Sequence, residues 1–261
     1  MKIAVVTGAS SGIGREFVKQ IDEVGYDEIW GIALEEDKLE HLKQDLKTHF
    51  RYFACDLTDE ESFKVYEEAL KDSNADVMLL INCSGFGKFG RYDEIPVGQS
   101  LNMIDLNCKA VVRMTETTIP YMKKGAKILQ ISSVASFQPI PYINIYAATK
   151  VFVKYYSMAL AEELKYKGIS VTAVCPFWTK TNFFDRAEKA SNKVVTKYVV
   201  MYDAHDVVKK ALKDANKGKL VSVYGAKTRA MLRFMALLPR KTVMKFWIKQ
   251  QKLDKKYKDK K

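Results

Sequence analysis

Short apolar segments alternate with longer amphipathic segments along most of the chain, and no other feature limits the possible folds as strongly. Most of the short segments are continuously apolar, as strands are when helices cover both faces of their sheet. Seven such segments are predicted as strands: Lys2–Val6, Glu28–Leu34, Tyr52–Cys55, Val77–Asn82, Ala126–Ser132, Ser170–Cys175 and Leu220–Tyr224. The segments between them have the apolar spacing of helices: Gly12–Val24, Asp37–Lys47, Asp59–Asp72, Gln99–Lys123, Ile143–Lys167 and Ala204–Asn216. Because strands that alternate with helices form right-handed crossovers, we expect an α/β fold with a Rossmann-like, doubly wound parallel sheet of about seven strands.

The basic charge of the chain is concentrated at its C-terminal end. Residues 226–261 hold 13 Lys and Arg against 2 Asp and Glu, a net charge of +11, whereas residues 1–225 hold 30 against 29, a net charge of +1. With 261 residues, 48% of them hydrophobic, the chain suits one large α/β domain. We therefore predict a single domain over residues 1–225, followed by a basic, amphipathic and helical extension over residues 226–261.

Cysteine and histidine usage argues against a metal site and against disulfide bonds. The cysteines are widely scattered without a Cys-x-x-Cys pair, and the histidines lack the spacing of metal ligands: Cys55, Cys83, Cys108 and Cys175; His41, His49 and His205. The chain runs from Met1 directly into an apolar strand, without the pattern of a signal peptide. No apolar stretch reaches the roughly 18 residues of a membrane span. We expect a cytoplasmic protein that binds no metal.

A glycine-rich turn joins the first predicted strand to the first predicted helix. It reads Thr7-Gly8-Ala9-Ser10-Ser11-Gly12-Ile13-Gly14. Glycines allow the backbone to turn tightly and to approach a pyrophosphate, and the first turn of the helix offers free N–H groups and a positive dipole end. The position of the turn between strand and helix therefore predicts a dinucleotide site, with a tight turn that binds nothing as the alternative.

A tyrosine and a lysine at helical spacing predict a device for proton transfer. Tyr146 and Lys150 are four residues apart and so share one face of the predicted helix Ile143–Lys167. An ammonium beside a phenol favours the phenolate, which brings its pKa of about 10 toward neutral pH. Ser133 directly follows a strand, at the edge where such sheets bind ligands, and its hydroxyl can donate to a substrate oxygen. Taken singly, each of these residues also fits an ordinary structural role.

In these motifs and their order the chain resembles the short-chain dehydrogenase/reductase family, in its group of single-domain members. The glycine turn matches the family's Thr-Gly-x-x-x-Gly-x-Gly element, and Asn82-Cys83-Ser84-Gly85 stands at its Asn-Asn-Ala-Gly position. The other matching positions are an acidic residue after the third strand, a catalytic tetrad and a segment after the sixth strand: Asp56; Asn107, Ser133, Tyr146 and Lys150; Pro176 and Thr181. The match extends in order from residue 2 to about residue 225.

The resemblance implies an NAD(P)-dependent oxidoreductase that interconverts a secondary alcohol and a ketone, with residues 1–225 as its dinucleotide-binding and catalytic domain. Tyr146 is then the general acid/base, Ser133 binds the reacting oxygen, and Lys150 lowers the phenol pKa and binds the nicotinamide ribose. Asn107 anchors a water that links Lys150 to solvent. The cofactor-binding residues that the resemblance implies are Gly8, Ser10, Ser11, Gly12, Ile13, Gly14, Leu34, Asp56, Leu57, Asn82, Gly85, Tyr146, Lys150, Pro176, Thr179 and Thr181.

The end of the second predicted strand bears on the choice between NAD(H) and NADP(H). In the family, members that prefer a 2′-phosphate have Arg near the position of Leu34 or a basic residue near that of Ser11, and NAD members have Asp at about Ala33. This chain has neither. The carboxylates of Glu35-Glu36-Asp37 would repel a phosphate, and Glu35 can reach the ribose hydroxyls. We therefore favour NAD(H) over NADP(H), with capping of the next helix by these carboxylates as the alternative.

Aromatic residues gather in the loops that are expected to line the substrate cleft. They are Phe86, Phe137, Phe177, Trp178, Phe183 and Phe184, and the last four belong to the variable substrate segment of the family, Phe177–Asp203. Phe177 replaces a glycine of the family pattern and brings a bulky ring beside the expected nicotinamide. We expect a small apolar alcohol or ketone, hydroxysteroid- or lipid-like, with packing of a lid as the alternative role of these rings. A 3-oxoacyl-thioester reductase that uses NADPH and a non-catalytic dinucleotide-binding sensor are the alternative functions.

The C-terminal segment Thr228–Ile248 mixes apolar and basic residues, and Pro239 should divide it into two helices. We expect this segment to pack against the body or against a partner subunit of a homodimer or homotetramer, with Lys252–Lys261 frayed. A lid over the cleft and peripheral contact with an anionic membrane are the alternatives. Nucleic-acid binding is not expected, because the basic residues lie outside any recognised binding module.

Overall fold

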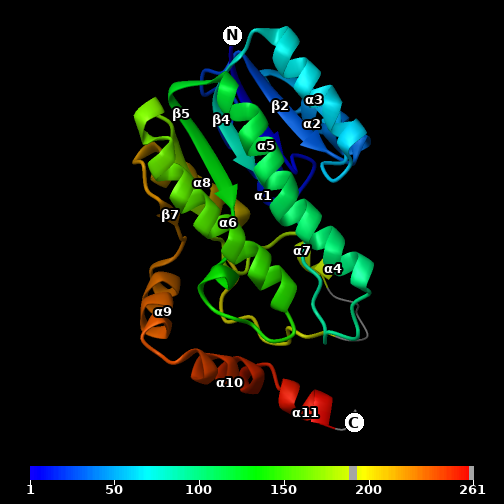
Figure 1. Ribbon diagram of the computed structural model, residues 1–261, viewed down its shortest axis with the longest axis vertical. Coiled ribbons are helices and arrows are strands. Elements are labelled where there is room, and N and C mark those ends of the chain that lie inside the picture. The colour runs from blue at the N-terminus through cyan, green and yellow to red at the C-terminus, as the bar shows by residue number, and fades with distance from the viewer. Residues whose placement is uncertain (188–192, 259–261) are drawn as a thin grey trace.

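A parallel sheet of seven strands forms the centre of the molecule, with helices on both faces (Figure 1). The protein is represented by a computed structural model, which describes residues 1–187 and 193–258. The strands lie in the order β3-β2-β1-β4-β5-β6-β7, so the chain winds outward in both directions from β1. Their bounds are β1 Lys2–Thr7, β2 Glu28–Ala33, β3 His49–Ala54, β4 Asp76–Asn82, β5 Met122–Ile131, β6 Ser170–Val174 and β7 Val221–Ser222. This order confirms the predicted Rossmann-like fold, and the winding reverses between β1 and β4, where ligands bind in such sheets.

Helices cover the sheet in two layers, each joined to it by an apolar core. α3, α5 and α6 pack on one face, and α1, α2 and α8 pack on the other. Neighbouring residues of β2 serve opposite layers, since Trp30 belongs to the first core and Ile29 to the second, as the pleat of a strand requires. The helices are α1 Gly12–Ile21, α2 Glu36–Gln44, α3 Glu60–Ser73, α4 Val97–Ile104, α5 Ala110–Thr118, α6 Asn144–Glu163, α7 Phe183–Ala187, α8 Ala204–Asn216, α9 Ala226–Ala236, α10 Arg240–Gln250 and α11 Leu253–Lys258.

The segment that was predicted as one helix, Gln99–Lys123, is instead a series of shorter elements. α4 is followed by a π-helical turn, Asp105–Lys109, then by α5 and a short 3₁₀ turn, Ile119–Tyr121. Pro120 cannot donate a backbone hydrogen bond and therefore ends the helix. β5 consequently begins at Met122, ahead of its predicted start at Ala126, and Met122 pairs with Val77 of β4.

Two other strands and one short helix differ from the prediction. β3 begins at His49 rather than Tyr52, because His49 already pairs with Glu28 of β2. β7 is shorter than predicted, since only two residues of β6 pair with it, Ala173 and Val174. α7, inside the expected substrate segment, was not predicted.

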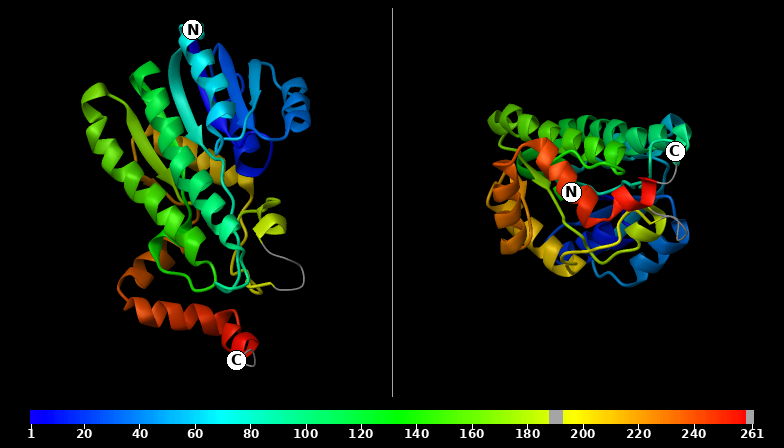
Figure 2. Two further views of the ribbon diagram at one scale, coloured as in Figure 1. Left: turned by 45° about the vertical axis from the view of Figure 1, so that its right-hand side comes forward. Right: turned by 90° about the horizontal axis from the view of Figure 1, so that it is seen from below.

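The C-terminal segment lies across the carboxyl ends of the strands as the helices α9, α10 and α11 (Figures 1 and 2). Pro239 directly precedes α10 and separates it from α9, as predicted. The expected fraying of Lys252–Lys261 is wrong as far as Lys258, because Leu253 of α11 is fully buried and Tyr257 stacks on Tyr142 with ring centroids 4.6 Å apart. Residues 259–261 lie outside the described residues. The division of the chain into residues 1–225 and 226–261 stays a prediction.

None of the helices in the described ranges is both long enough and apolar enough to cross a membrane.

Candidate active site

A cavity of about 1260 Å³ lies at the carboxyl ends of the strands. The glycine turn after β1 lines one part of it, and the tail helices α9 and α10 line another. The loops after β2, β3, β4, β5 and β6 complete the wall. Within residues 1–187 and 193–258, no three His, Cys, Asp or Glu side chains are grouped so that they could hold a metal ion.

The glycine turn has a shape that side chains would prevent. Gly8 and Gly12 have positive φ angles of 68° and 53°, which other residues rarely adopt. A Cβ atom on Gly14 would overlap the carbonyl oxygen of Gly8, so the first turn of α1 packs directly on the loop. The N–H of Gly8 donates to the carbonyl of Ile32 at 2.7 Å, which ties the turn to β2. A glycine loop of this shape at a helix N-terminus, inside the cavity, fits the pyrophosphate of a dinucleotide.

The ends of β1 and β4 are joined at the floor of the cavity. The hydroxyl oxygen of Thr7 accepts hydrogen bonds from the backbone N–H groups of both Cys83 and Ser84, each at 3.0 Å. Gly8 passes so close that a Cβ atom there would lie 3.0 Å from the nitrogen of Ser84. The Cys83-Ser84 pair thus leaves the backbone turn intact in the place of the family's Asn-Ala pair.

Asn107 is fully buried behind the cavity and does not line it. Its side chain accepts from the N–H of Phe86 at 3.0 Å and donates to the carbonyl of Phe86 at 2.8 Å and to the hydroxyl of Thr149 at 3.1 Å. These bonds connect the loop after β4 to α6, the helix that carries Tyr146 and Lys150. Asn107 is therefore a positioning residue here, and its role as the anchor of a water stays a prediction.

Tyr146 lies beside Ser133 in an aromatic surrounding. Burial raises the pKa of Tyr146 to about 12, and the neighbouring hydroxyl of Ser133 opposes this rise. The rings of Phe183 and Phe89 enclose the phenol ring, with centroids 5.5 Å and 5.8 Å away. The Ser133 oxygen also accepts from the N–H of Ala135 at 3.1 Å, so its position is fixed. Ser133 and Tyr146 are brought together as predicted.

Lys150 lies one helical turn further along α6 and is buried, with 6% of its surface exposed. Its Nζ donates to the carbonyl of Ile131 at 2.9 Å and lies 5.7 Å from the centroid of the Tyr146 ring. Burial lowers the pKa of Lys150 to about 8. Burial thus dominates the pKa of Tyr146. The lowering of the phenol pKa by Lys150 stays a prediction.

A cluster of charged groups surrounds Glu35 where the second strand ends. Glu35 accepts from the Ser10 hydroxyl at 2.8 Å and from the guanidinium of Arg186 on α7 at 2.6 Å, and Lys38 lies 3.4 Å away. Burial opposes ionisation of this carboxyl, but the hydrogen bonds from Ser10 and Arg186 and the charge of Lys38 lower its pKa to about 2. Leu34 is 63% exposed beside it. Glu35 thus carries a stable negative charge at the edge of the cavity.

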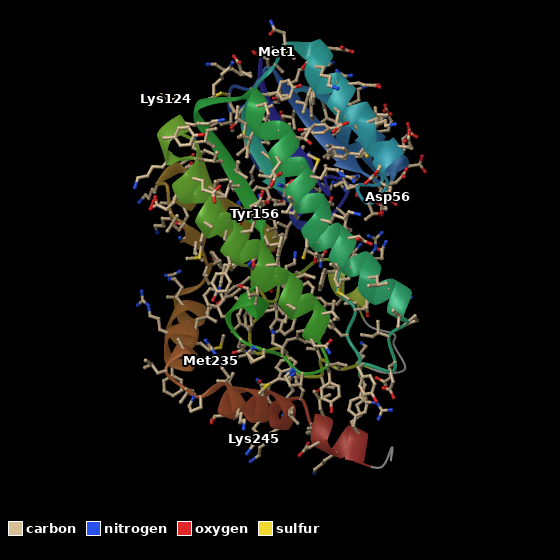
Figure 3. The ribbon with its side chains drawn as sticks, in the orientation of Figure 1. Met1, Asp56, Lys124, Tyr156, Met235 and Lys245 are labelled. Atoms are coloured by element: carbon tan, nitrogen blue, oxygen red, sulfur yellow. The ribbon has the colours of Figure 1, made fainter. Side chains whose placement is uncertain are left out.

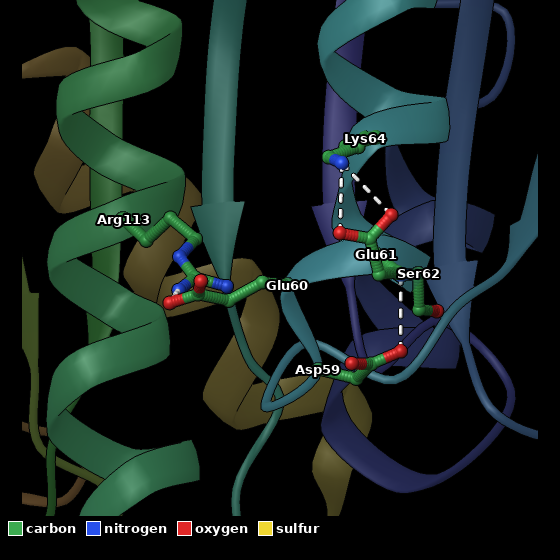
Figure 4. Close-up of polar contacts among 6 residues, drawn as sticks. All are labelled: Asp59, Glu60, Glu61, Ser62, Lys64 and Arg113. Carbon is green, nitrogen blue, oxygen red and sulfur yellow. Dashed lines mark hydrogen bonds and ion pairs between the residues drawn. The ribbon is translucent and has the colours of Figure 1, made fainter.

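Asp56 is held in the loop between β3 and α3. Its Oδ1 accepts from the backbone N–H and the hydroxyl of Thr58 at 2.9 Å and 2.8 Å, and its own N–H donates to the hydroxyl of Ser62 at 2.8 Å. Asp59 accepts from the N–H of Ser62 at 3.0 Å and caps α3 (Figure 4). The loop is therefore fixed with Asp56 at the cavity wall.

Most of the predicted site residues line this one cavity. They are Gly8, Ser10, Ser11, Gly12, Ile13, Gly14, Leu34, Asp56, Leu57, Gly85, Phe86, Ser133, Tyr146, Lys150, Pro176, Phe177, Trp178, Thr179, Thr181, Phe183 and Phe184. Thr181 lies against the glycine turn, since a Cβ atom on Gly12 would approach its methyl group to 3.3 Å. The part of the predicted substrate segment at positions 188–192 lies outside the described residues.

Asn82 and Phe137 do not line the cavity, contrary to prediction. Asn82 is buried and donates to Thr115 at 3.0 Å and to Gln130 at 2.9 Å, so its amide joins β4 to β5 and α5. The ring of Phe137 packs in an apolar cluster with Val223 and Leu232, and the Nζ of Lys154 lies 3.9 Å from its centroid. The pleat of β4 turns the Asn82 side chain away from the cavity, and the direction of the loop after β5 does the same for Phe137. A sequence motif indicates neither the pleat nor the loop direction.

The sequence interpretation missed a large part of the apolar wall. The missed residues lie in the loop after β4, before and at the start of α6, and in the tail: Phe89, Ile95, Ile140, Ile143, Met231, Leu232, Phe234, Met235, Leu238, Val243, Phe246 and Trp247. The apolar spacing of the tail was a signal for them, but it could not indicate which surface the tail covers. The tail both packs against the body and forms a wall of the cavity, which combines two of the expected roles.

Gln251, at the end of α10, holds the substrate segment to the tail. It is buried, and its side-chain oxygen accepts from the N–H groups of Thr196 and Lys197 at 2.8 Å and 3.0 Å. Its side-chain nitrogen donates to the carbonyl of Lys197 at 3.0 Å. One amide therefore fixes Lys197, a residue of the cavity wall, and its neighbour Thr196.

Comparison with known proteins agrees with this geometry. The sequence profile described as short chain dehydrogenase matches residues 2–192. The very-long-chain 3-oxoacyl-CoA reductase of Macaca fascicularis is 32% identical over 188 residues, which cover 68% of this chain and 59% of that protein. An uncharacterized oxidoreductase of Staphylococcus epidermidis is 29% identical over 177 residues, which cover 67% of this chain and 76% of that protein.

Among solved structures, a short-chain dehydrogenase from Sphingobium yanoikuyae in complex with NADPH has a similar fold. Its TM-score is 0.75 at 24% sequence identity, and the superposition covers 92% of this chain and 97% of that chain.

Proposed function

The chain belongs to the short-chain dehydrogenase/reductase family, and on this basis we propose that it interconverts a secondary alcohol and a ketone on a bulky, apolar substrate. It is an oxidoreductase that uses a nicotinamide dinucleotide and acts on CH–OH groups. One observation carries the proposal for the substrate. The phenol of Tyr146, beside Ser133, lies in a single cavity between the glycine turn and a wall of aromatic and aliphatic side chains.

The residues of this chain hold the cofactor and handle the proton. The glycine turn fits the pyrophosphate, Asp56 the adenine, and Lys150 the nicotinamide ribose. When bound, the cofactor supplies the hydride chemistry. With a pKa of about 12 the Tyr146 phenol is protonated at neutral pH, so in ketone reduction it donates its proton to the oxygen that Ser133 holds. The Lys150 ammonium, 5.7 Å from the ring centroid, stabilises the phenolate that remains.

We propose NAD(H) as the preferred cofactor. The pKa of Glu35 is about 2, so this carboxylate is charged at all working pH values. A ribose hydroxyl can donate to it, whereas a 2′-phosphate would be repelled. Arg186 and Lys38 are the cations nearest to Glu35, and both already interact with it. Arg186 and Lys38 could bind a 2′-phosphate only if their ion pairs with Glu35 were broken.

The test is a panel of ketones of increasing apolar bulk, assayed with NADH and with NADPH. We expect kcat/KM to rise about tenfold or more from a small ketone to a steroid-sized one, because each buried methylene contributes roughly 0.8 kcal/mol. We expect NADH to be the better cofactor. Equal kcat/KM along the panel would contradict an apolar site, and cofactor binding without turnover of any ketone would favour a non-catalytic sensor.

A 3-oxoacyl-thioester reductase is the second candidate, favoured by two observations. The matched relative from Macaca fascicularis is a 3-oxoacyl-CoA reductase, and Lys88, Arg186 and Lys197 of this chain line the cavity. These cations could bind the phosphates of a thioester carrier. The discriminating measurement compares a 3-oxoacyl thioester with a free ketone of equal chain length. A preference of about tenfold for the thioester, with NADPH as the better cofactor, would support this candidate.

We also propose that the chain forms a homodimer or homotetramer in the cytoplasm. Exposed apolar side chains on the outer surface of α4 and α6 support self-association: Leu101, Phe152 and Tyr155. The free thiols of Cys55, Cys83, Cys108 and Cys175 suit a reducing compartment. Analytical ultracentrifugation tests the oligomer, and a monomer at every concentration would contradict it.

A further inference from the structure

The outer side of α10 carries a row of lysines. Lys241, Lys245 and Lys249 recur at intervals of four residues and so lie along one face of the helix, and all three are exposed. Figure 3 shows Lys245 pointing away from the body of the molecule, whereas Met235 of α9 lies on the side of the tail toward the body. Among the residues that the structure describes, none of the ion pairs within 4.0 Å includes one of these three ammonium groups. Their charge is therefore available to an external anion.

Large apolar side chains are exposed on the same segment of the chain. Phe234 is 63% exposed, Leu237 at the turn between α9 and α10 is 83% exposed, and Phe246 is 65% exposed. Arg233 and Arg240 are neighbours of these residues in the sequence and are also exposed. Exposure of several large apolar side chains on a short basic segment is unfavourable in water, and it is typical of surfaces that insert into a membrane interface.

The orientation of this face is fixed by the inner side of α10. Val243 and Trp247 are buried, and the indole N–H of Trp247 donates to the carbonyl of Pro141 at 3.0 Å. Arg240 donates to the carbonyl of Phe137 at 3.0 Å. α10 therefore cannot turn its lysine row toward the body without losing these contacts, and the basic face stays directed outward.

From these observations we propose that the outer face of α9 and α10 is a docking surface for an anionic membrane. The tail, residues 226–261, has a net charge of +11 on a body that is almost neutral, which matches a negatively charged lipid surface. The interleaved Phe and Leu side chains match the acyl boundary of a bilayer, which neither nucleic acid nor an acidic protein surface offers.

The docking surface is continuous with the wall of the cavity. Phe234 and Phe246 line the cavity and are also largely exposed, so the apolar wall reaches the outer surface at these two rings. A membrane docked on this face would lie against that opening. An apolar substrate could then pass from the lipid to Tyr146 with little exposure to water. This part of the inference rests on the proposed apolar substrate, whereas membrane binding does not.

The experiment is sedimentation of the full chain with vesicles of phosphatidylcholine alone or with about 30% phosphatidylserine. We expect binding only to the anionic vesicles, and release when the salt concentration is raised from about 0.1 M to about 0.5 M. The variant Lys241→Gln/Lys245→Gln/Lys249→Gln should lose on the order of 100-fold in vesicle affinity. Leu237→Gln should lose about tenfold, because it removes an apolar contact without changing the charge.

The matched control is Lys71→Gln/Lys124→Gln/Lys167→Gln, which removes the same charge from exposed lysines outside the tail. Lys124 lies at the opposite end of the molecule from α10 (Figure 3). The control should bind vesicles as the unmodified protein does.

Equal loss of vesicle affinity in both triple variants would overturn the proposal, since only net charge would then matter. Absence of vesicle binding, together with a raised KM of the tail variant for an acyl-carrier-protein thioester alone, would assign the surface to a protein partner. In each variant, unchanged turnover of a water-soluble ketone reports separately on the proposed enzyme activity.

Discussion

Lys150 is a buried cation of the site whose pKa is strongly altered by its surroundings. The ordinary pKa of a lysine is 10.5, and burial lowers that of Lys150 to about 8. Below pH 8 the folded protein must keep an ammonium buried that the unfolded chain leaves in water. Above about pH 10.5 the group is neutral in both states, so the cost disappears. The unfavourable contribution of Lys150 to stability is therefore complete below pH 8 and declines as the pH rises from about 8 to 10.5.

Because the buried charge of Lys150 is unfavourable at pH 7, we predict that Lys150→Met makes the protein without cofactor more stable at this pH. The net gain should be roughly 1–3 kcal/mol, once the lost hydrogen bond to Ile131 is subtracted. The measurement is urea unfolding at pH 7 and at pH 10. The advantage of the variant should shrink at pH 10. A variant that is less stable at pH 7, or an advantage that is independent of pH, would show that Lys150 is not a buried charge in the free protein.

The sequence motifs identified residues of the site but not the direction of their side chains. Ser133, Tyr146 and Lys150 could be predicted, because their spacing on a strand end and a helix determines where they meet. The direction of the Asn82 and Phe137 side chains away from the cavity could not be predicted, since it depends on the network with Thr115 and Gln130 and on the apolar cluster around Leu232. The raised pKa of Tyr146 depends likewise on the rings that enclose it.

Among the elements, the junction of α10 with α11 determines the shape of the substrate wall. We predict that Gln251→Ala raises KM for a bulky ketone about five- to tenfold while KM for a small ketone changes little. The substitution removes the two part-buried hydrogen bonds that the N–H groups of Thr196 and Lys197 donate to Gln251, each worth about 0.5–1.5 kcal/mol. The wall should therefore be less ordered, and hydrogen exchange at these two amides should accelerate.

Lys252→Ala is the matched control, because Lys252 is adjacent in sequence but exposed. It should leave both KM values and the exchange of the two amides unchanged. Equal exchange rates in Gln251→Ala and the unmodified protein would show that the substrate segment does not depend on this amide.

The elements of the sheet were predictable because continuous apolar runs are needed wherever helices cover both faces. The breaks inside the predicted helix Gln99–Lys123 were less visible. Pro120 was a local signal for its end, but the π-helical turn that carries Asn107 follows from bonds to the loop after β4. The early start of β5 at Met122 depends on pairing with Val77, a partner far away in sequence.

For the molecule as a whole, the tail is the part for which the structure adds most to the prediction from the sequence. Charge and apolar spacing predicted two helices on either side of Pro239, and this was confirmed. That these helices close the cavity could not be predicted, because the direction in which a chain returns over its sheet is set by contacts such as the Trp247–Pro141 hydrogen bond. The body provides the cofactor site and the proton donor, and the tail completes the wall for the substrate.

The central claim is that Tyr146 transfers the proton that accompanies hydride transfer in this cavity. The most direct measurement is kcat with NADH on the best ketone of the panel, for the unmodified protein, for Tyr146→Phe and for the control Tyr166→Phe. Tyr166 has the same side chain but is 81% exposed.

We predict that Tyr146→Phe lowers kcat by about 10²–10⁴-fold, because a positioned general acid contributes on this order, while its affinity for NADH stays within about threefold. Tyr166→Phe should have normal activity. Near-normal kcat in Tyr146→Phe would contradict the assignment of this residue and with it the proposed reaction at this site.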